Sequence, residues 1–195
     1  MTVCCATGNP GKLREFRLAA AQAGVQVETL PGLAEMPPCK ETGDTFEANA
    51  ILKAEYYGRH ASGLLFADDS GLEVDALGGA PGVYSARFAG PGATDEANNQ
   101  LLLERMRGIR NRSARFVCVI ALVDCGHLQA VFRSTVEGQI LEEPRGSNGF
   151  GYDPLFYWAP FGCSFGEVAP ELKLTVSHRG AALRSLFGHL SMRGV

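Results

Sequence analysis

The sequence has no long apolar run, no block of basic residues and no C-x-x-C pair of cysteines. Its apolar stretches are far shorter than the ~20 residues that a membrane-spanning helix requires. The net charge is −3, and without a Lys/Arg block this balance argues against duplex nucleic acid or an acidic membrane as the main partner. The six cysteines contain no C-x-x-C pair, so their spacing gives no support to a zinc site.

The composition is that of an ordinary globular protein. Of the 195 residues, 46% are hydrophobic and 20% are charged, and we find no internal repeat and no long linker. This length is sufficient for a substantial core, so we expect a single domain over residues 1–195. A strand is expected within three residues of the N-terminus, which leaves no room for a signal peptide. Because Cys4, Cys5 and Cys118 lie in apolar runs, we interpret them as core residues of a protein in the reducing cytoplasm.

Along the chain, apolar runs typical of strands alternate with segments of helical periodicity, and this alternation predicts an α/β fold. Tight turn residues at 124–126 separate two strand-like runs and predict an antiparallel hairpin, so the central sheet should be mixed rather than purely parallel. Asp44 and Glu47 resemble a helix capping box, and Thr94 is a suitable cap for a later helix. The expected strands are 3–6, 25–30, 64–69, 116–123 and 128–136, and the expected helices are 12–23, 44–60, 95–106 and 180–190.

Two adjacent acids follow the apolar run at 64–67. A buried strand rarely ends on Asp68-Asp69, since neighbouring carboxylates disfavour each other's ionisation unless a cation or solvent intervenes. The carboxyl ends of strands are where open α/β sheets bind ligands. The alternative is an exposed turn, because Asp, Ser and Gly are common turn residues.

A glycine-containing loop, residues 7–12, links the first strand to the first helix. A helix N-terminus offers backbone N–H groups and the positive end of a dipole to an anion, and Lys12 adds a full charge there. The loop is not a Walker A motif, because its glycines are too close together and Leu13 replaces the required Ser or Thr. The alternative is a turn that only links the strand to the helix and binds nothing.

Two later segments also carry candidate binding residues. Residues 149–154 place aromatic rings and Asp153 among glycines, where a ring could stack on a base and the acid could accept a hydrogen bond. The alternative is that the rings pack into the core, the commoner fate of an aromatic side chain. Ser177 is a good helix cap, and His178 and Arg179 follow it as donors suited to a carbonyl or an anion, unless the arginine is simply solvated.

Taken together, six blocks resemble the signature blocks of the inosine triphosphate pyrophosphatase family, the house-cleaning enzymes for non-standard purine nucleoside triphosphates. The resemblance runs in order from residue 7 to about residue 183. It implies an elongated α/β fold with a mixed central β-sheet flanked by helices, a substrate cleft between two lobes, and a homodimer. The blocks are residues 7–12, 41–53, 67–72, 78–87, 149–154 and 177–180.

The resemblance also implies roles for individual residues. Glu41 and Asp69 are expected to hold Mg²⁺, and Asp69 is also expected to accept a proton from the attacking water. Lys53 is expected to add positive charge at the catalytic centre. Residues 7–12 are expected to bind the triphosphate, and a later group the base. The substrate-binding residues implied in this way are Thr7, Gly8, Asn9, Pro10, Gly11, Lys12, Ser70, Phe150, Gly151, Tyr152, Asp153, Lys173, His178 and Arg179.

The chain departs from the family pattern at two positions. Many relatives have Glu where this chain has Ala48, so Glu47 or Glu41 must serve if that acid helps to hold the metal. Relatives often have another Glu where this chain has Leu172, so the resemblance implies one acid fewer beside Lys173 in this chain.

The predicted activity is hydrolysis of ITP, dITP, XTP or dXTP to the monophosphate and pyrophosphate by Mg²⁺-assisted direct attack of water. Two alternatives remain open on the sequence alone. One is a Maf-like pyrophosphatase for other modified nucleotides, and the other is a non-catalytic nucleotide-binding protein.

Overall fold

The computed structural model describes residues 1–192. Its contacts divide the chain into two compact units, each assembled from separate segments. Unit 1 contains residues 1–69, 118–134 and the segment from 178 onward, and unit 2 contains residues 70–117 and 135–177. The prediction that the whole chain forms one domain stays a prediction.

A seven-stranded sheet has the order β2-β1-β3-β4-β5-β6-β7. Strand β1 pairs in parallel with β2 and β3, whereas β6 pairs antiparallel with both β5 and β7. The predicted mixed sheet is therefore confirmed. The strands are β1 (Thr2–Cys5), β2 (Gln26–Thr29), β3 (Leu64–Val74), β4 (Ser113–Asp124), β5 (His127–Ile140), β6 (Phe156–Trp158) and β7 (Cys163–Ser164).

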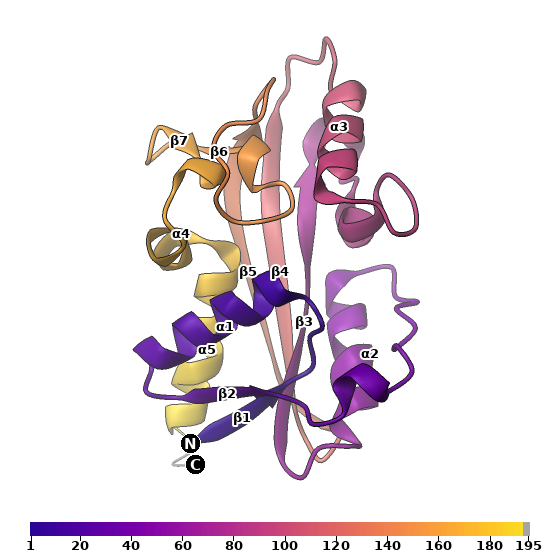
Figure 1. Cartoon of the computed structure of the whole chain (residues 1–195), viewed down its shortest axis with the longest axis vertical. Coiled ribbons are helices and arrows are strands. Elements are labelled where there is room, and N and C mark those ends of the chain that lie inside the picture. The colour runs from indigo at the N-terminus through magenta and orange to yellow at the C-terminus, as the bar shows by residue number, and fades with distance from the viewer. Residues whose placement is uncertain (193–195) are drawn as a thin grey trace. The chain divides into compact units, whose positions relative to one another are not determined.

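In unit 1, three helices cover the sheet. Helices α1 (Pro10–Gln22) and α5 (His178–Met192) lie side by side on one side of β3, and α2 (Phe46–Gly58) lies on the other (Figure 1). The rings of Phe16 on α1 and Phe66 on β3 are fully buried and meet edge to face, with their centroids 5.1 Å apart. This packing fixes α1, and the loop before it, against the strand that carries Asp68 and Asp69.

Unit 2 contains α3 (Asp95–Arg105), α4 (Pro170–Val176) and several short 3₁₀ turns. Its core includes the buried rings of Phe116, Phe156 and Phe165, whose centroids lie 4.4 to 6.2 Å apart. The sequence did not predict α4, β6 or β7. These elements have seven, three and two residues, too few for a periodic pattern to develop.

The predicted hairpin between β4 and β5 is confirmed. The strands are neighbours in the sheet, and only Cys125 and Gly126 separate them. Both residues have positive φ, 47° and 82°, which is the requirement of the type I′ turns that match the twist of paired strands.

Three predicted boundaries were wrong for local reasons. Strand β3 does not end at Asp69 but continues to Val74, because residues after Gly71 return to a buried apolar pattern. Helix α1 begins at Pro10 rather than Lys12, since proline suits the first helical position. Helix α2 is capped by Thr45, whose side chain accepts from the Ala48 N–H, so Asp44 is not the cap.

Candidate active site

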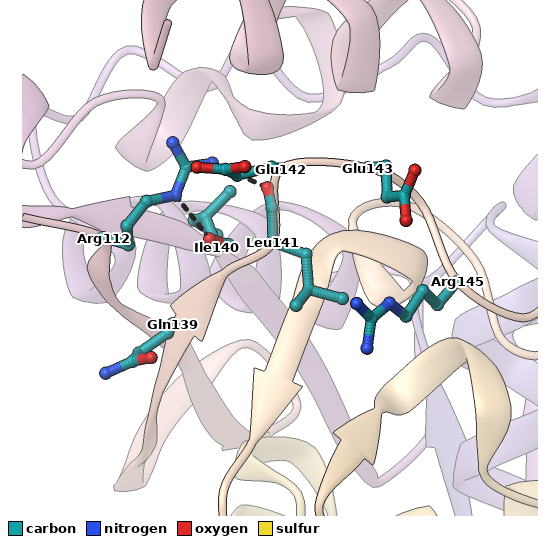
Figure 2. Close-up of a pocket in the computed structure, with 7 residues that line it drawn as sticks. All are labelled: Arg112, Gln139, Ile140, Leu141, Glu142, Glu143 and Arg145. Carbon is teal, nitrogen blue, oxygen red and sulfur yellow. Dashed lines mark hydrogen bonds between the residues drawn. The ribbon is translucent and has the colours of Figure 1, made fainter. Parts of the chain in front are cut away.

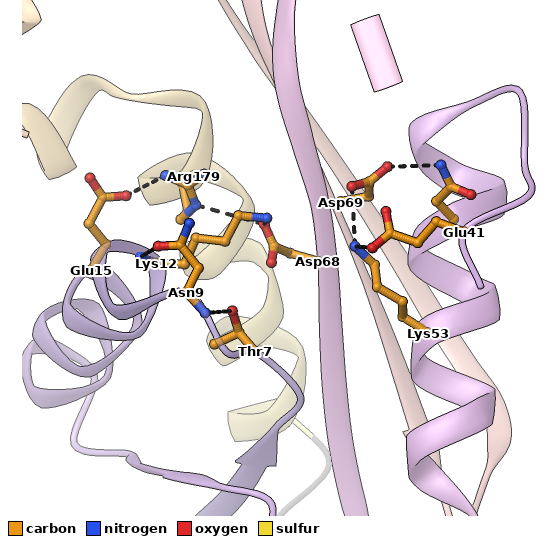
Figure 3. A network of polar contacts seen from close by, with 10 residues as sticks. Thr7, Asn9, Lys12, Glu15, Glu41, Lys53, Asp68, Asp69 and Arg179 are labelled. Atoms are coloured by element: carbon orange, nitrogen blue, oxygen red, sulfur yellow. Dashed lines mark hydrogen bonds and ion pairs between the residues drawn. The ribbon is translucent and has the colours of Figure 1, made fainter. Parts of the chain in front are cut away.

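Strand β3 carries Asp68 and Asp69 through the interior of the protein rather than to the end of a strand. The two residues are only 3% and 6% exposed. Successive side chains of a strand point to opposite faces, so the two carboxylates are directed away from each other (Figure 3). The adjacent acids therefore belong to two different clusters, one beside α2 and one beside α1 and α5.

The carboxylate of Asp69 is held by two residues of α2. Lys53 Nζ lies 3.2 Å from Asp69 Oδ1, and Asn49 Nδ2 donates to Asp69 Oδ2 at 3.2 Å. Asn49 and Lys53 are four residues apart and so share one helix face, as predicted. Lys53 Nζ also lies 3.4 Å from Glu41 Oε1. One ammonium group thus joins the two carboxylates that the family resemblance assigns to the metal.

The segment that carries Glu41 is fixed by Asn49. The Gly43 N–H donates to Asn49 Oδ1 at 2.8 Å, so the two ends of one amide side chain hold both this segment and Asp69. A Cβ on Gly43 would lie 2.8 Å from Asn49 Oδ1 and 2.7 Å from the Ala48 Cβ. Any side chain at position 43 would therefore displace the segment from α2.

The charges of this cluster suit proton transfer. Burial raises the pKa of Asp69; Lys53 and Lys12 lower it, but Glu41 and Asp68 add to the rise, and the net pKa is raised. A carboxylate with a raised pKa accepts a proton more readily. Burial alone would lower the pKa of Lys53, but Asp69, Asp68 and Glu41 outweigh it and the pKa is raised. Lys53 therefore remains an ammonium at neutral pH.

On the other face of β3, Asp68 is surrounded by cations. Lys12 Nζ lies 2.9 Å from Asp68 Oδ2, and Arg179 Nε lies 3.9 Å from the same oxygen. Burial would raise the pKa of Asp68, but the charges of Lys12, Arg179 and Lys53 outweigh it and the pKa is lowered. Asp68 therefore stays ionised and holds Lys12 in place.

Arg179 is tied to α1 as well as to Asp68. Its Nη1 lies 2.5 Å from Glu15 Oε2, and both side chains are buried. Glu15 follows Lys12 by three residues, so the two lie on neighbouring positions of one helix face. The sequence analysis did not identify Glu15, although a charged residue on the face that packs α1 into the core was a signal that could have found it.

The loop at residues 7–12 is organised by its own side chains. Thr7 Oγ1 accepts from the Asn9 N–H at 3.2 Å, and Asn9 Oδ1 caps the helix by accepting from the Lys12 N–H at 3.0 Å. Gly8, Asn9 and Pro10 are exposed. The structure thus places an exposed loop at a capped helix N-terminus beside a lysine, a geometry suited to an anion.

The metal-binding prediction concerns Glu41 and Asp69. Within residues 1–192 no group of three or more His, Cys, Asp or Glu side chains is arranged to hold a metal. Mg²⁺ is commonly bound by one or two carboxylates together with waters and substrate phosphates. Glu41 and Asp69, which both contact the Lys53 ammonium, are ligands of the kind that this ion takes. Glu47 is exposed, and of the two acids considered for the Ala48 departure it is Glu41 that contacts Lys53.

A second group of predicted residues meets within unit 2. Lys173 Nζ lies 2.6 Å from Asp153 Oδ2, and both residues are buried. The same oxygen accepts from the Phe150 N–H at 2.9 Å, and Lys173 Nζ lies 5.2 Å from the centroid of the Phe150 ring. A Cβ on Gly149 would collide with the Asp153 carboxylate, which explains the glycine at that position.

The remaining predicted residues differ in exposure. Phe150 is half-buried, whereas Tyr152 is buried and its hydroxyl donates to the Ser85 carbonyl at 2.7 Å. That bond favours the core interpretation of the Tyr152 ring. Ser70 directly follows Asp69 in β3 and is half-buried, and His178 is buried at the start of α5.

A separate hollow in unit 2 has a volume of about 530 Å³ (Figure 2). Arg112 spans its wall and donates to the carbonyls of Ile140 and Leu141, each at 2.6 Å. These bonds hold the end of β5, a structural role. The predicted site residues all fall in the described part of the chain, and none is among the lining residues, which are Arg112, Gln139, Ile140, Leu141, Glu142, Glu143 and Arg145.

The chain is similar to a known family and to individual proteins over nearly its whole length. The model of the Ham1 family matches residues 3–189. A protein named dITP/XTP pyrophosphatase from Acidobacterium capsulatum is 49% identical over 199 residues, which cover 97% of this chain and 98% of that protein. A protein of the same name from Thermus thermophilus is 54% identical over 190 residues, or 95% of this chain and 90% of the relative.

Solved structures agree with these sequence matches. The Staphylococcus aureus Ham1 protein superposes with a TM-score of 0.87 at 39% identity, covering 99% of this chain and all of that one. A HAM1 protein from Coxiella burnetii gives a TM-score of 0.88 at 38% identity, covering 98% and 99% of the two chains. The resemblance to a pyrophosphatase family is thereby confirmed. The chain belongs to the Ham1 family.

Proposed function

We propose that the protein hydrolyses non-standard purine nucleoside triphosphates, such as dITP and XTP, to the monophosphate and pyrophosphate. The observation that carries this proposal is the arrangement of the buried Asp69 with Lys53 and Glu41. Relatives that match nearly the whole chain bear the name dITP/XTP pyrophosphatase. Within residues 1–192, no helix has both the length and the apolar character needed to cross a membrane.

In the proposed mechanism, Asp69 accepts the proton of the water that attacks the α-phosphorus. Its raised pKa supports this role. Lys53 lies against both Asp69 and Glu41 and would neutralise charge that develops on the phosphate. Glu41 and Asp69 would hold Mg²⁺, which when bound acidifies the attacking water and neutralises the polyphosphate. The loop at residues 7–12 and the ammonium of Lys12 would bind the phosphates.

The residues proposed to bind the base are Phe150, Gly151, Tyr152, Asp153 and Lys173, together with His178 and Arg179. Phe150 is the half-buried ring of this group, and Asp153 and Lys173 are buried polar groups that could make hydrogen bonds to a purine edge. One alternative is a non-catalytic nucleotide-binding protein. Such a protein does not require a buried carboxylate with a raised pKa beside a lysine, so the state of Asp69 favours catalysis. The similarity to proteins named dITP/XTP pyrophosphatase likewise favours the proposed activity over a Maf-like one.

We further propose a homodimer in the cytoplasm, as the family resemblance implies. The six cysteines are free thiols, a state that a reducing compartment maintains. Sedimentation equilibrium of the purified chain tests the dimer.

The proposed activity predicts strong selection at position 6 of the purine. With Mg²⁺ and a panel of ITP, dITP, XTP, GTP and ATP, we expect pyrophosphate release from the first three and very little from ATP. A site built to hydrogen-bond one substrate group rejects an analogue that lacks it by ~10⁴-fold or more. The measurement is kcat/KM for pyrophosphate release. Equal rates for ITP and ATP, or release of orthophosphate alone, would contradict the proposal.

Lys12 and Lys53 are expected to contribute to phosphate binding and turnover. Each charge-assisted contact is worth about 1.5–3 kcal/mol, so Lys12→Ala and Lys53→Ala should each lower kcat/KM for ITP by ~10-fold to ~100-fold. We expect Lys53→Ala to act mainly on kcat, because Lys53 contacts Asp69. Lys40→Ala removes an exposed lysine and serves as the control. If either variant had the same kcat/KM as this control, its lysine would not contribute to phosphate binding or turnover.

A further inference from the structure

We infer that Asp95 and Asn99 of helix α3 are positioning residues that hold the turn at residues 149–153. This turn contains four of the residues proposed to bind the base, so the catalytic consequence of the inference rests on the proposed function. Neither Asp95 nor Asn99 was among the residues that the sequence or the family resemblance assigned to the site. The inference depends on contacts that all lie within unit 2.

Both backbone groups of Gly151 are bound by α3. The Gly151 N–H donates to Asp95 Oδ2 at 2.6 Å, and the Gly151 carbonyl accepts from Asn99 Nδ2 at 2.9 Å. Asp95 and Asn99 are four residues apart and therefore lie on one face of the helix. The bond to Asp95 is charge-assisted, and such bonds are shorter and stronger than neutral ones; Asp95 itself is exposed, so solvent screens part of this gain. Two side chains of one rigid helix thus hold a single residue of the turn.

The start of α3 is itself well fixed. Thr94 caps the helix by accepting from the Ala97 N–H at 3.2 Å. Asn98 donates to the Ala86 carbonyl at 3.3 Å and accepts from the Ala89 N–H at 2.8 Å. These bonds hold the end of the helix from which Asp95 and Asn99 contact the turn.

The turn needs such support because of its backbone conformation. Gly149 and Gly151 have φ values of 76° and 62°, in the left-handed region that glycine populates freely. Two glycines so close together give the segment many alternative conformations. The bonds from α3 to Gly151 select one of them, and ordering a binding segment before the ligand arrives lowers the entropic cost of binding.

Fixing Gly151 also fixes its neighbours. Phe150 is held on its other side by the bond from its N–H to Asp153, and Asp153 is paired with Lys173. Tyr152 is held through its hydroxyl by Ser85.

If Gly151 moved, the Phe150 ring and the Asp153 carboxylate would lose the relative placement that a purine requires. Asp95 therefore acts on the base through these residues.

The test compares Asp95→Ala with Glu96→Ala. Both changes remove an acid from the first turn of α3 and so have the same effect on the helix dipole, but only Asp95 contacts Gly151. Amide hydrogen exchange measured by NMR should become faster at Gly151 in Asp95→Ala and stay unchanged in Glu96→Ala. This readout does not depend on any activity. Asp95→Asn keeps the shape of the side chain and should give an intermediate exchange rate, and Asn99→Ala should also speed exchange in the turn.

Kinetic measurements distinguish an effect on binding of the base from an effect on binding of the phosphates. In Asp95→Ala we expect KM for ITP to rise ~10-fold with kcat little changed, the pattern of lost binding rather than lost chemistry. Inhibition by inorganic pyrophosphate should be unchanged, since the proposed phosphate residues lie in unit 1. Equal Gly151 exchange and equal KM in Asp95→Ala and Glu96→Ala would overturn the inference. If Asp95→Ala speeds Gly151 exchange but the wild-type protein does not hydrolyse ITP, the positioning role of Asp95 is supported and the proposed function is overturned.

Discussion

Asp69→Asn is expected to lower kcat by at least ~100-fold, the low end of what a general base contributes. The substitution keeps the shape of the side chain and an oxygen that can face Lys53. It removes the proton acceptor and one of the two carboxylates proposed to hold Mg²⁺. Turnover of ITP, measured as pyrophosphate release at saturating substrate, is the quantity that tests this. Thermal unfolding of the variant should be recorded alongside, so that loss of the fold is not mistaken for loss of chemistry.

Asp68→Asn is the matched comparison, because the two acids are neighbours in one strand but face opposite clusters. Asp68 holds Lys12, so its loss should raise KM for the triphosphate more than it lowers kcat. A folded Asp69→Asn variant with near wild-type turnover would remove Asp69 from the mechanism. Identical kinetic defects in the two variants would show that the separation of the two faces has no functional meaning.

The sequence predicted which polar residues gather beside β3 better than it predicted their arrangement. The run of 64–69 was predicted to be a strand that carries two candidate site acids; the strand is confirmed, but its expected end at Asp69 was wrong. A strand that ends there would place both acids together at a sheet edge. Strand β3 instead continues to Val74, so both acids lie within the strand and its period of two directs them to opposite faces. The alternating buried residues Leu72 and Val74 were the local signal of this continuation.

Long-range partners were the other part that the sequence could not predict. The spacing of Asn49 and Lys53 predicted a shared helix face, and both residues do contact Asp69. The pair formed by Glu15 and Arg179, in contrast, joins residues 164 positions apart. Local spacing carries no information about such a pair. The same holds for Asp95 and Gly151, which meet only because α3 packs beside a turn 56 positions further along the chain.

Arg179→Met is expected to destabilise the protein strongly as well as to impair it. Removing one partner of a buried ion pair typically costs about 3–5 kcal/mol, because the other charge stays buried after its counter-charge is lost. In this chain the residue left behind is Glu15, which is 7% exposed and lies 2.5 Å from the guanidinium. Chemical denaturation should therefore show a large fall in the free energy of unfolding. Arg14→Met, which removes an exposed arginine of α1, should leave this free energy almost unchanged.

The double variant Glu15→Gln/Arg179→Met separates this structural role from the predicted role in base selection. Neutralising Glu15 should restore much of the lost stability, because the side chain that has lost the guanidinium then carries no buried charge. If Arg179 donates to the oxygen at C6 of the purine, the stable double variant should still lose far more activity on ITP than on ATP, and the ratio between the two substrates should narrow. Equal losses on both substrates would mean that Arg179 acts by holding Asp68 and α1 in place, and the prediction that it selects the base would be wrong.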